Sequence, residues 1–208
     1  MVRNDLKCIF IHINKTGGVS IIRTLGMLHI HISVPLLFSD EIYLDEQYSE
    51  WMSKPTRYKR STEDNWLSIE EMREKWDEYY KFAVIRNPWD RVVSDHFYCK
   101  KDGFLSEDAS FRQDVKNTLD NYERWKLPCY DWLTKDGKVA VDRVCRFENL
   151  QDDFNLVCDD LEIKRKRLPH LNKTNHVHYS EYYDDELREM VAEKYKKDIE
   201  YFGYEFGK

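Results

Sequence analysis

The sequence predicts an α/β fold of one domain and three layers, with a parallel sheet at its centre. Two short segments, residues 8–13 and 82–85, are apolar almost without interruption. Continuous rather than alternating hydrophobicity is typical of strands buried on both faces, as in a parallel sheet. Strand-like segments alternate with helix-like segments, which indicates helices on both faces of the sheet. The 208 residues contain no visible linker, so we expect one domain over residues 1–208.

The first half of the chain contains two of the predicted strands and two helices. The strand at 8–13 leads through a glycine-containing loop into a helix that begins near residue 18. Residues 28–34 alternate with period two and end at a proline, which predicts a further strand. Residues 40–66 are polar and rich in aromatic side chains, and we expect an excursion around a site. The sequence SIEE at 68–71 is a capping box that predicts a helix to about Tyr79.

The second half continues the alternation. After the strand at 82–85, Asn87 is a preferred N-cap residue and Pro88 suits the first helical position. Helices are also predicted near 108–124 and 149–161. Between them, Asp136-Gly137 predicts a hairpin turn that precedes a strand at 139–144. The last predicted helix covers residues 184–201, and its apolar stripe consists of Leu187, Met190, Val191, Tyr195 and Ile199.

Composition and charge exclude several classes of protein. The chain is 41% hydrophobic and 35% charged, which excludes disordered and collagen-like classes. The formal net charge of −6 gives no global footprint for nucleic acid, so an anionic ligand must be held by local donors. No apolar run approaches the ~20 residues of a membrane span, and the first residues lack a signal-peptide pattern. We therefore expect a cytoplasmic protein with neither a membrane nor a nucleic-acid partner.

The five cysteines include no CxxC pair, so neither a zinc site nor a disulfide framework is indicated. Reduced and mostly buried thiols are expected, and no metal. A basic run at 164–167 (KRKR) either steers an anionic cofactor or acceptor or is a solvated turn.

The loop between the first strand and the first helix has the residue types of an anion site. A pair of glycines before a helix N-terminus lets backbone N–H groups converge on an anion. Lys15 adds a cation, and Thr16 and Ser20 add hydroxyl donors. The lysine precedes the glycines, so the GxxxxGK[ST] motif of kinases and NTPases is absent. The alternative is a glycine turn with a solvated lysine.

Arg86 follows the second buried strand, at the edge where open α/β sheets bind ligands. Arginine suits a terminal phosphate because its fork donates two parallel charge-assisted hydrogen bonds. On a helical wheel Ser94 lies away from the core face and can join Arg86 at a ligand. The residues expected on the core face are Trp89, Val92, Val93 and His96. The alternative for Arg86 is a surface ion pair with Asp90.

These segments resemble motifs of the carbohydrate-type sulfotransferases. Residues 11–20 (IHINKTGGVS) resemble the family's HIPKTGGTS loop, and residues 86–94 (RNPWDRVVS) resemble its RNPWDRLVS motif. Residues 146–150 (RFENL), 171–175 (LNKTN) and 179–183 (YSEYY) are similar to later elements of the family. The motifs occur in the family's order over essentially the whole chain, which implies one sulfotransferase domain.

The resemblance implies transfer of a sulfuryl group from 3′-phosphoadenosine 5′-phosphosulfate (PAPS) to a hydroxyl or amine of an acceptor, a carbohydrate or a small metabolite. The product is adenosine 3′,5′-bisphosphate (PAP), and no metal is needed. By the same resemblance Arg86 and Ser94 hold the 3′-phosphate, and Lys173 and Thr174 belong to a loop that closes over the cofactor. The residues implied for a P-loop-like phosphosulfate-binding loop are Asn14, Lys15, Thr16, Gly17, Gly18, Val19 and Ser20. Lys15 is also the implied catalytic cation, because charge develops on the leaving phosphate.

Two departures from the family pattern stand out. Asn14 replaces the usual proline of the loop. Related small sulfotransferases carry a histidine before the capping-box helix as general base, and residues 61–68 (STEDNWLS) contain none. A base matched to neutral pH is a histidine or a carboxylate whose pKa is raised by burial, which leaves Asp64 or His31. Two other functions remain open: a PAPS- or PAP-binding protein with weak or lost catalysis, and a nucleotide-dependent phosphotransferase.

Overall fold

The computed structural model describes residues 2–27, 33–38, 69–119, 127–169, 171 and 177–208. Its central sheet has four strands in the order β1 (Val2–Arg3), β2 (Cys8–Ile11), β3 (Tyr80–Ile85) and β6 (Arg143–Arg146). The pairs β2–β3 and β3–β6 are parallel, whereas β1 pairs with β2 in the antiparallel sense. The predicted α/β fold with a central, mostly parallel sheet is confirmed, and the antiparallel edge strand is an addition that the sequence analysis missed.

The two central strands are buried on both faces, as their continuous hydrophobicity predicted. All four residues of β2 are buried. Ile9 and Ile11 belong to the hydrophobic cluster on one face, and Cys8 and Phe10 belong to the cluster on the other. Phe10 pairs with Phe82 across the parallel ladder, and their rings stack with centroids 4.8 Å apart.

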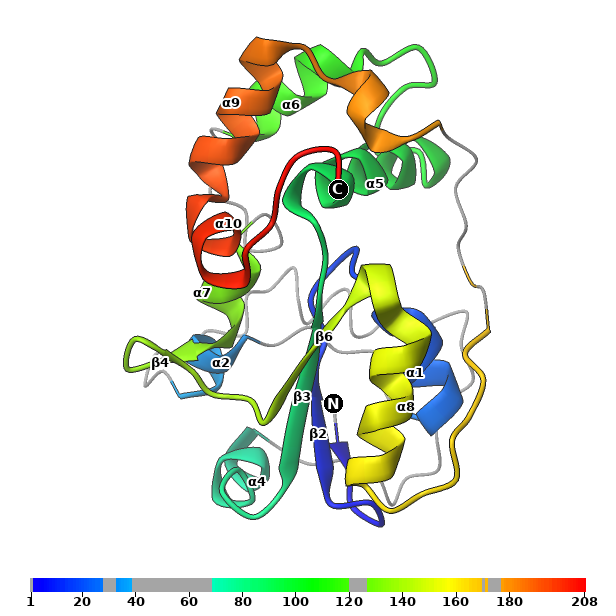
Figure 1. Ribbon diagram of the computed structural model, residues 1–208, viewed down its shortest axis with the longest axis vertical. Coiled ribbons are helices and arrows are strands. Elements are labelled where there is room, and N and C mark those ends of the chain that lie inside the picture. Colours follow the sequence, from blue (N-terminus) through cyan, green and yellow to red (C-terminus); the bar gives the residue numbers. More distant parts are fainter. Residues whose placement is uncertain (1, 28–32, 39–68, 120–126, 170, 172–176) are drawn as a thin grey trace.

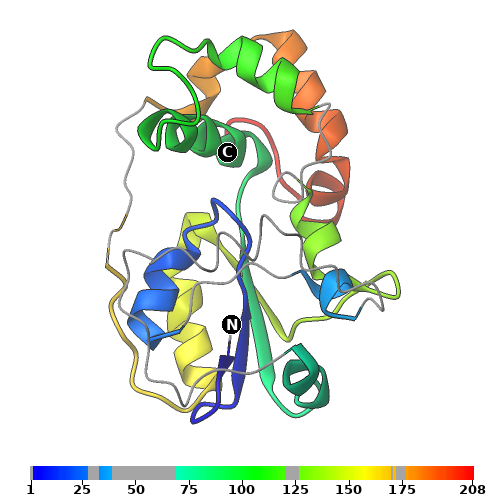
Figure 2. The same ribbon diagram turned by 180° about the vertical axis from the view of Figure 1, so that it is seen from behind.

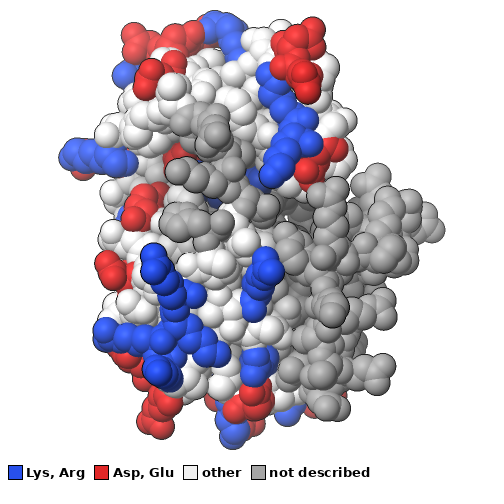
Figure 3. All heavy atoms as spheres, turned by 90° about the vertical axis from the view of Figure 1, so that its right-hand side faces the viewer, with Lys and Arg blue, Asp and Glu red and all other residues white. Residues whose placement is uncertain are grey.

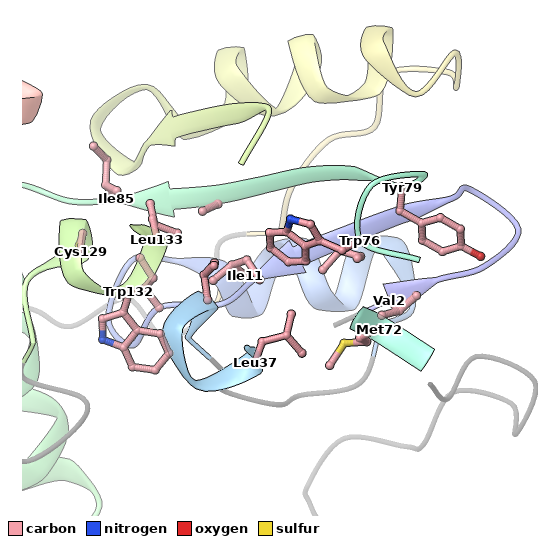
Figure 4. Close-up of a cluster of buried hydrophobic side chains, with 14 of the residues drawn as sticks. Val2, Ile11, Leu37, Met72, Trp76, Tyr79, Ile85, Cys129, Trp132 and Leu133 are labelled. Carbon is pink, nitrogen blue, oxygen red and sulfur yellow. The ribbon is translucent and has the colours of Figure 1, made fainter. Parts of the chain in front are cut away.

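Helices cover both faces of the sheet and complete the three layers (Figures 1 and 2). On one face lie α1 (Gly18–Leu25) and α8 (Leu150–Asp160). On the other lie α2 (Val34–Leu37), α4 (Ile69–Glu74) and α7 (Cys129–Leu133). Figure 4 shows how the core of this second face is filled by side chains from both the strands and the helices, among them Ile11, Leu37, Trp76, Ile85 and Trp132.

A helical layer lies beyond the carboxyl ends of the strands, at the top of Figure 1. It contains α5 (Pro88–Lys101), α6 (Phe111–Leu119), α9 (Asp185–Lys194) and α10 (Lys196–Phe202). The cluster that holds it together includes Trp89, Val93, Val115, Leu187 and Val191. The loops that leave the carboxyl edge of the sheet therefore run between the sheet and this layer.

The predicted helix cap at Asn87 and the predicted hairpin turn at Asp136-Gly137 are confirmed. Asn87 caps α5, because its Oδ1 accepts a hydrogen bond from the N–H of Trp89 at 3.1 Å. Asp136 and Gly137 form the turn of a hairpin between β4 (Thr134–Lys135) and β5 (Lys138–Val139), with φ of 52° and 75°. Positive φ at both central residues is the requirement of a two-residue type I′ turn.

Four predicted elements differ from the structure in their type or bounds. Val34, the end of the strand predicted at 28–34, instead begins α2; the following proline is tolerated in a first helical turn, where its N–H is not needed. The helix predicted to reach Tyr79 ends at Glu74 and continues as turns. The strand predicted at 139–144 is divided between β5 and β6, and the last helix is divided at Tyr195 into α9 and α10. Residues 28–32 and the excursion at 40–66 lie outside the described residues.

Short 3-10 helices at Phe147–Asn149 (η3) and Tyr179–Tyr182 (η4) carry two of the later sequence motifs. All five cysteines are free, and four of them are buried while Cys99 is partly exposed. Burial raises the pKa of Cys8, Cys129 and Cys145 to about 12. In the described part of the chain, no helix is both long and apolar enough to cross a membrane.

Candidate functional site

The loop at 14–17 connects β2 to α1 and presents an unusual run of free backbone donors. Lys15 and Gly17 adopt φ of 65° and 80°, and the Thr16 hydroxyl donates to the carbonyl of Ile13 at 2.9 Å. The N–H groups of residues 15–19 donate to no acceptor among the residues that the structure describes. Successive N–H groups in such a conformation at a helix N-terminus form a concavity for an anion.

Both glycines of the loop are required by its close packing. A Cβ atom on Gly17 would lie 2.8 Å from Cδ2 of Phe147, and one on Gly18 would lie 2.7 Å from Nε2 of His12. Gly17 also has a positive φ, which an L side chain rarely adopts. The loop is therefore packed closely between the His12 ring, which follows β2, and the Phe147 ring of η3.

Lys15 supplies an ammonium group at this loop. Its Nζ lies 3.6 Å from the centroid of the Tyr98 ring on α5, and it forms no ion pair with a carboxylate in the described part of the chain. Burial lowers the pKa of Lys15 to about 8; the charge of Asp95 acts to raise this pKa, and that of Arg86 to lower it further. A cation over an aromatic face is available to an incoming anion, since no carboxylate has to be displaced.

Arg86 joins the two motifs that the sequence analysis selected. Its Nε donates to Oδ2 of Asp90 at 2.8 Å, and its NH1 donates to the carbonyl of Lys15 at 3.0 Å. The guanidinium also stacks on the ring of Phe147 at 3.9 Å. The ion pair with Asp90 thus exists, but it is buried rather than on the surface, with side-chain exposures of 9% and 16%. The same arginine also holds the loop at 14–17 through the carbonyl of Lys15.

One side of α5 faces the loop. Residues 90, 94 and 98 of α5 are spaced by four and therefore lie along a single stripe, and Arg86 lies just before the start of this helix. Arg86 contacts the loop at one end of this stripe and Tyr98 at the other. Ser94 is 8% exposed, and its hydroxyl has no hydrogen-bond partner within the described residues. The expected core face is confirmed for Trp89, Val93 and His96, which are buried, whereas Val92 is only partly so.

The later motifs meet the second motif at the start of α5. The carboxylate of Glu148, in η3, accepts a hydrogen bond from the N–H of Asn87 at 2.6 Å. The amide of Asn87 in turn donates to the hydroxyl of Tyr179, in η4, at 3.2 Å. A cavity of about 490 Å³ next to them is lined by Asn87, Asp90, Glu148, Val177, His178, Tyr179 and Lys208. Segments far apart in the sequence are therefore assembled around Asn87, at the start of α5.

Ser20, expected to donate to a phosphate, is engaged elsewhere. Its Oγ donates to the carbonyl of Pro169 at 2.7 Å and ties α1 to the segment that follows α8. That segment includes the basic run at 164–167, whose side chains are exposed; Arg165 pairs with Asp159 at 2.7 Å. Figure 3 faces this side of the molecule, and Lys and Arg side chains gather on it. Whether the run steers an anion stays a prediction.

Four of the predicted site residues, His31, Asp64, Lys173 and Thr174, lie outside the described residues. One buried residue of the site was missed. Arg91 is 3% exposed, and its Nε donates to the carbonyl of Asn14 at 3.1 Å. The available signal was a charged side chain next to the core positions of a predicted helix.

The model of the sulfotransferase family matches residues 1–205. The chain belongs to the sulfotransferase family. The resemblance of its motifs is thereby confirmed, and the family is one of enzymes that transfer sulfuryl groups.

Other similarities are more distant. An uncharacterized protein of Archaeoglobus fulgidus is 35% identical over 79 residues, which span 38% of this chain and 64% of that protein. Among solved structures, a sulfotransferase from Alicyclobacillus acidocaldarius gives a TM-score of 0.49 at 18% identity and covers 96% of both chains. The mouse sulfotransferase SULT7A1 complexed with PAP gives 0.41 at 15% identity, over 96% of this chain and 72% of that one. The family assignment rests on the family match alone.

Proposed function

We propose that this protein transfers a sulfuryl group from PAPS to a hydroxyl or amine of a carbohydrate or small-metabolite acceptor in the cytoplasm. The observation that carries the proposal is the run of N–H groups at residues 15–19 that find no acceptor among the described residues, beside Lys15 and Arg86. Such a group of donors at a helix N-terminus, with two cations, suits a phosphosulfate. Any α-helix leaves the first N–H groups without intrahelical partners, but here the run of N–H groups that lack an acceptor in the described residues extends back from α1 to Lys15.

The residues present fit PAPS. The absence of a Cβ at Gly17 and Gly18 lets an anion approach the backbone closely. The proposed contacts of the 5′-phosphosulfate are the loop residues from Asn14 to Val19, and Ser20 would join them by exchanging its bond to the carbonyl of Pro169 for one to the ligand. The proposed contacts of the 3′-phosphate are Arg86 and Ser94. Lys173 and Thr174 complete the proposed cofactor site on the ground of the family motif. When bound, PAPS supplies an activated sulfuryl group whose leaving group is a phosphate.

In the proposed reaction, the bond between sulfur and the bridging phosphate oxygen breaks while a bond from sulfur to the acceptor atom forms. Lys15 holds positive charge where that oxygen gains negative charge, and this charge stabilises the transition state. The acceptor loses its proton to a base. We assign the base to Asp64 or His31, and the two single variants Asp64→Asn and His31→Asn decide between them. The variant of the true base lowers turnover with PAP affinity nearly unchanged, and the other variant serves as its control.

Calorimetric titration with PAP in the presence of EDTA tests the cofactor assignment. We expect binding of one PAP per chain, tighter than that of adenosine 5′-phosphate, which lacks the 3′-phosphate that Arg86 and Ser94 would hold. No heat of binding at high protein concentration would refute the assignment. Binding of PAP without turnover on any acceptor of a broad panel would instead identify a binding protein that lacks catalysis.

A further inference from the structure

Arg91 is a buried cation that connects the loop to the helical layer. It lies on α5, is 3% exposed, and reaches two backbone carbonyls with one guanidinium. Its Nε donates to the carbonyl of Asn14 at 3.1 Å, and its NH1 donates to the carbonyl of Leu127 at 2.8 Å. A charge in the interior is costly unless its hydrogen bonds are made, so these contacts must be well formed.

A buried carboxylate lies on the far side of the same network. Asp198, on α10, is fully buried and accepts hydrogen bonds from the N–H groups of Cys129 at 2.8 Å and Tyr130 at 2.7 Å. NH1 of Arg91 lies 3.7 Å from Sγ of Cys129. Burial raises the pKa of Asp198, and the positive charge of Arg91 acts to lower it. Arg91 and Asp198 therefore hold α7 between them, but only Arg91 touches the loop.

The contact with Asn14 fixes the orientation of a peptide plane. In a trans peptide the C=O and the next N–H point in opposite directions. The carbonyl of Asn14 faces Arg91, so the N–H of Lys15 faces away from it. The carbonyl of Lys15 faces Arg86 in the same manner, so the N–H of Thr16 faces away from Arg86. Arg91 of α5 and Arg86, which precedes this helix, thus orient the first two of the five N–H groups that lack an acceptor in the described part of the chain.

We propose that Arg91 is a positioning residue for the phosphosulfate loop: by holding the carbonyl of Asn14 it aims the N–H of Lys15 into the anion site and keeps the Lys15 ammonium over Tyr98. This inference rests on the proposed function for the identity of the anion. The positive φ of Lys15 supports it, since a non-glycine residue keeps that conformation only when its surroundings hold it there.

The test compares two changes in the same buried network. Arg91→Lys keeps the charge but cannot reach the carbonyls of Asn14 and Leu127 together, because an ammonium lacks the arginine fork. Arg91→Gln removes the buried charge and is a second variant in case the lysine does not fold. Asp198→Asn is the matched control, since it disturbs α7 while leaving the contact with Asn14 in place. Thermal unfolding of each variant verifies that it is folded.

The first readout needs no ligand: the pKa of the Lys15 ammonium, measured by NMR. We expect a value near 8 in the wild type and in Asp198→Asn, and a rise towards the ordinary value of 10.5 in the Arg91 variants, as Lys15 leaves its half-buried place. The second readout is PAP affinity, which falls roughly tenfold in the Arg91 variants, the effect of one hydrogen bond to a charged group, and is unchanged in Asp198→Asn.

Arg91 variants that match Asp198→Asn in both readouts would overturn the inference and make Arg91 a structural residue only. A wild type that fails to bind PAP, with the expected pattern of Lys15 pKa values, would refute the proposed function and leave the positioning role supported.

Discussion

A buried or partly buried lysine lies at each end of the central parallel strands, and the surroundings of the two lysines differ. At the amino edge, Nζ of Lys81 donates to the carbonyls of Trp76 at 3.1 Å and Tyr79 at 2.7 Å and pairs with Asp142 at 2.9 Å. All three ammonium donors are thereby used. At the carboxyl edge, Nζ of Lys15 lies over the Tyr98 ring. Burial of a lysine therefore does not mark a binding site; a surplus of donors over acceptors does.

The arginines at the two ends of the strands differ in the acceptors that they contact. Arg143, at the amino edge, donates through Nε to Asp160 at 2.6 Å and to the hydroxyl of Tyr80 at 3.1 Å. Arg86, at the carboxyl edge, divides its donors between a carboxylate and a backbone carbonyl. Side-chain donors occupy the carbonyls of Asn14 and Lys15, and the N–H groups of residues 15–19, which have no acceptor in the described part of the chain, are left for a ligand.

The largest difference in turnover is expected between the alanine variants of Lys15 and Lys81. Lys15→Ala should lower turnover by roughly 100-fold or more, a barrier increase of about 3 kcal/mol, because the lysine acts mainly where charge develops. PAP affinity should fall much less, since the loop N–H groups and Arg86 remain. Lys81→Ala, the matched control, should lower the melting temperature but not turnover per folded molecule. Assays with a labelled sulfuryl donor beside PAP titrations measure both quantities; equal losses of rate and affinity in Lys15→Ala would show that it only anchors the ligand.

The second largest difference is expected between the alanine variants of Arg86 and Arg143. Arg86→Ala should weaken PAP binding by about 1.5–3 kcal/mol, as for a hydrogen bond to a charged group. Arg143→Ala should leave PAP binding unchanged and cost at most ~1 kcal/mol of stability, because its ion pair with Asp160 is partly exposed. Calorimetry and thermal unfolding separate the two. Wild-type affinity in folded Arg86→Ala would make Arg86 a structural ion-pair residue.

Glycine substitutions sharpen the comparison between a packed loop and an open turn. Gly18→Ala should destabilise the protein by ~1–3 kcal/mol, as overpacking does, and should weaken PAP binding because the loop must move away from His12. Gly137→Ala, in the hairpin, meets open space but has φ of 75°, and should cost about 1–2 kcal/mol without affecting PAP. The reverse order of PAP affinities would contradict the placement of the site.

The smallest effect is that of pH. The ligand-free pKa of Lys15 is about 8, so the ammonium loses its proton as pH rises through this value and PAP affinity should fall, by at most about tenfold per pH unit. A bound anion favours the charged form, so binding near pH 8 should take up a proton. Titrations in buffers with different heats of ionisation detect this uptake. Lys15→Arg should abolish it, and uptake that persists in this variant would assign the proton to another group.

The central strands and the start of α5 could be predicted because their sequence patterns lie within a few consecutive residues. The apolar runs at 8–13 and 82–85 gave the two central strands, and Asn87 with Pro88 gave the start of α5. The five-residue helix α7 was missed, because so short a segment shows no periodicity. The break at Tyr195 was also missed, since the apolar stripe continues across it.

The same distinction applies to the site. The loop and Arg86 were selected from residue types and spacing, and the structure joins them through the bond from Arg86 to the carbonyl of Lys15. The role predicted for Ser94 stays a prediction. The role of Arg91 was missed because its acceptors, the carbonyls of Asn14 and Leu127, are backbone atoms 77 and 36 positions away. The bond from Ser20 to the carbonyl of Pro169 was missed for the same reason. Sequence patterns show which side chains can donate, but not which carbonyls the fold brings to them.

Backbone amide resonances recorded during a titration with PAP test the central claim most directly. The N–H groups of residues 15–19 should show the largest chemical-shift changes and move downfield as they donate to the ligand. The amides of Lys81 and Arg143, at the opposite edge of the sheet, should remain unchanged. Saturable changes centred on the amino edge, with the amides of 15–19 unmoved, would contradict the assignment of the donor surplus to the anion site.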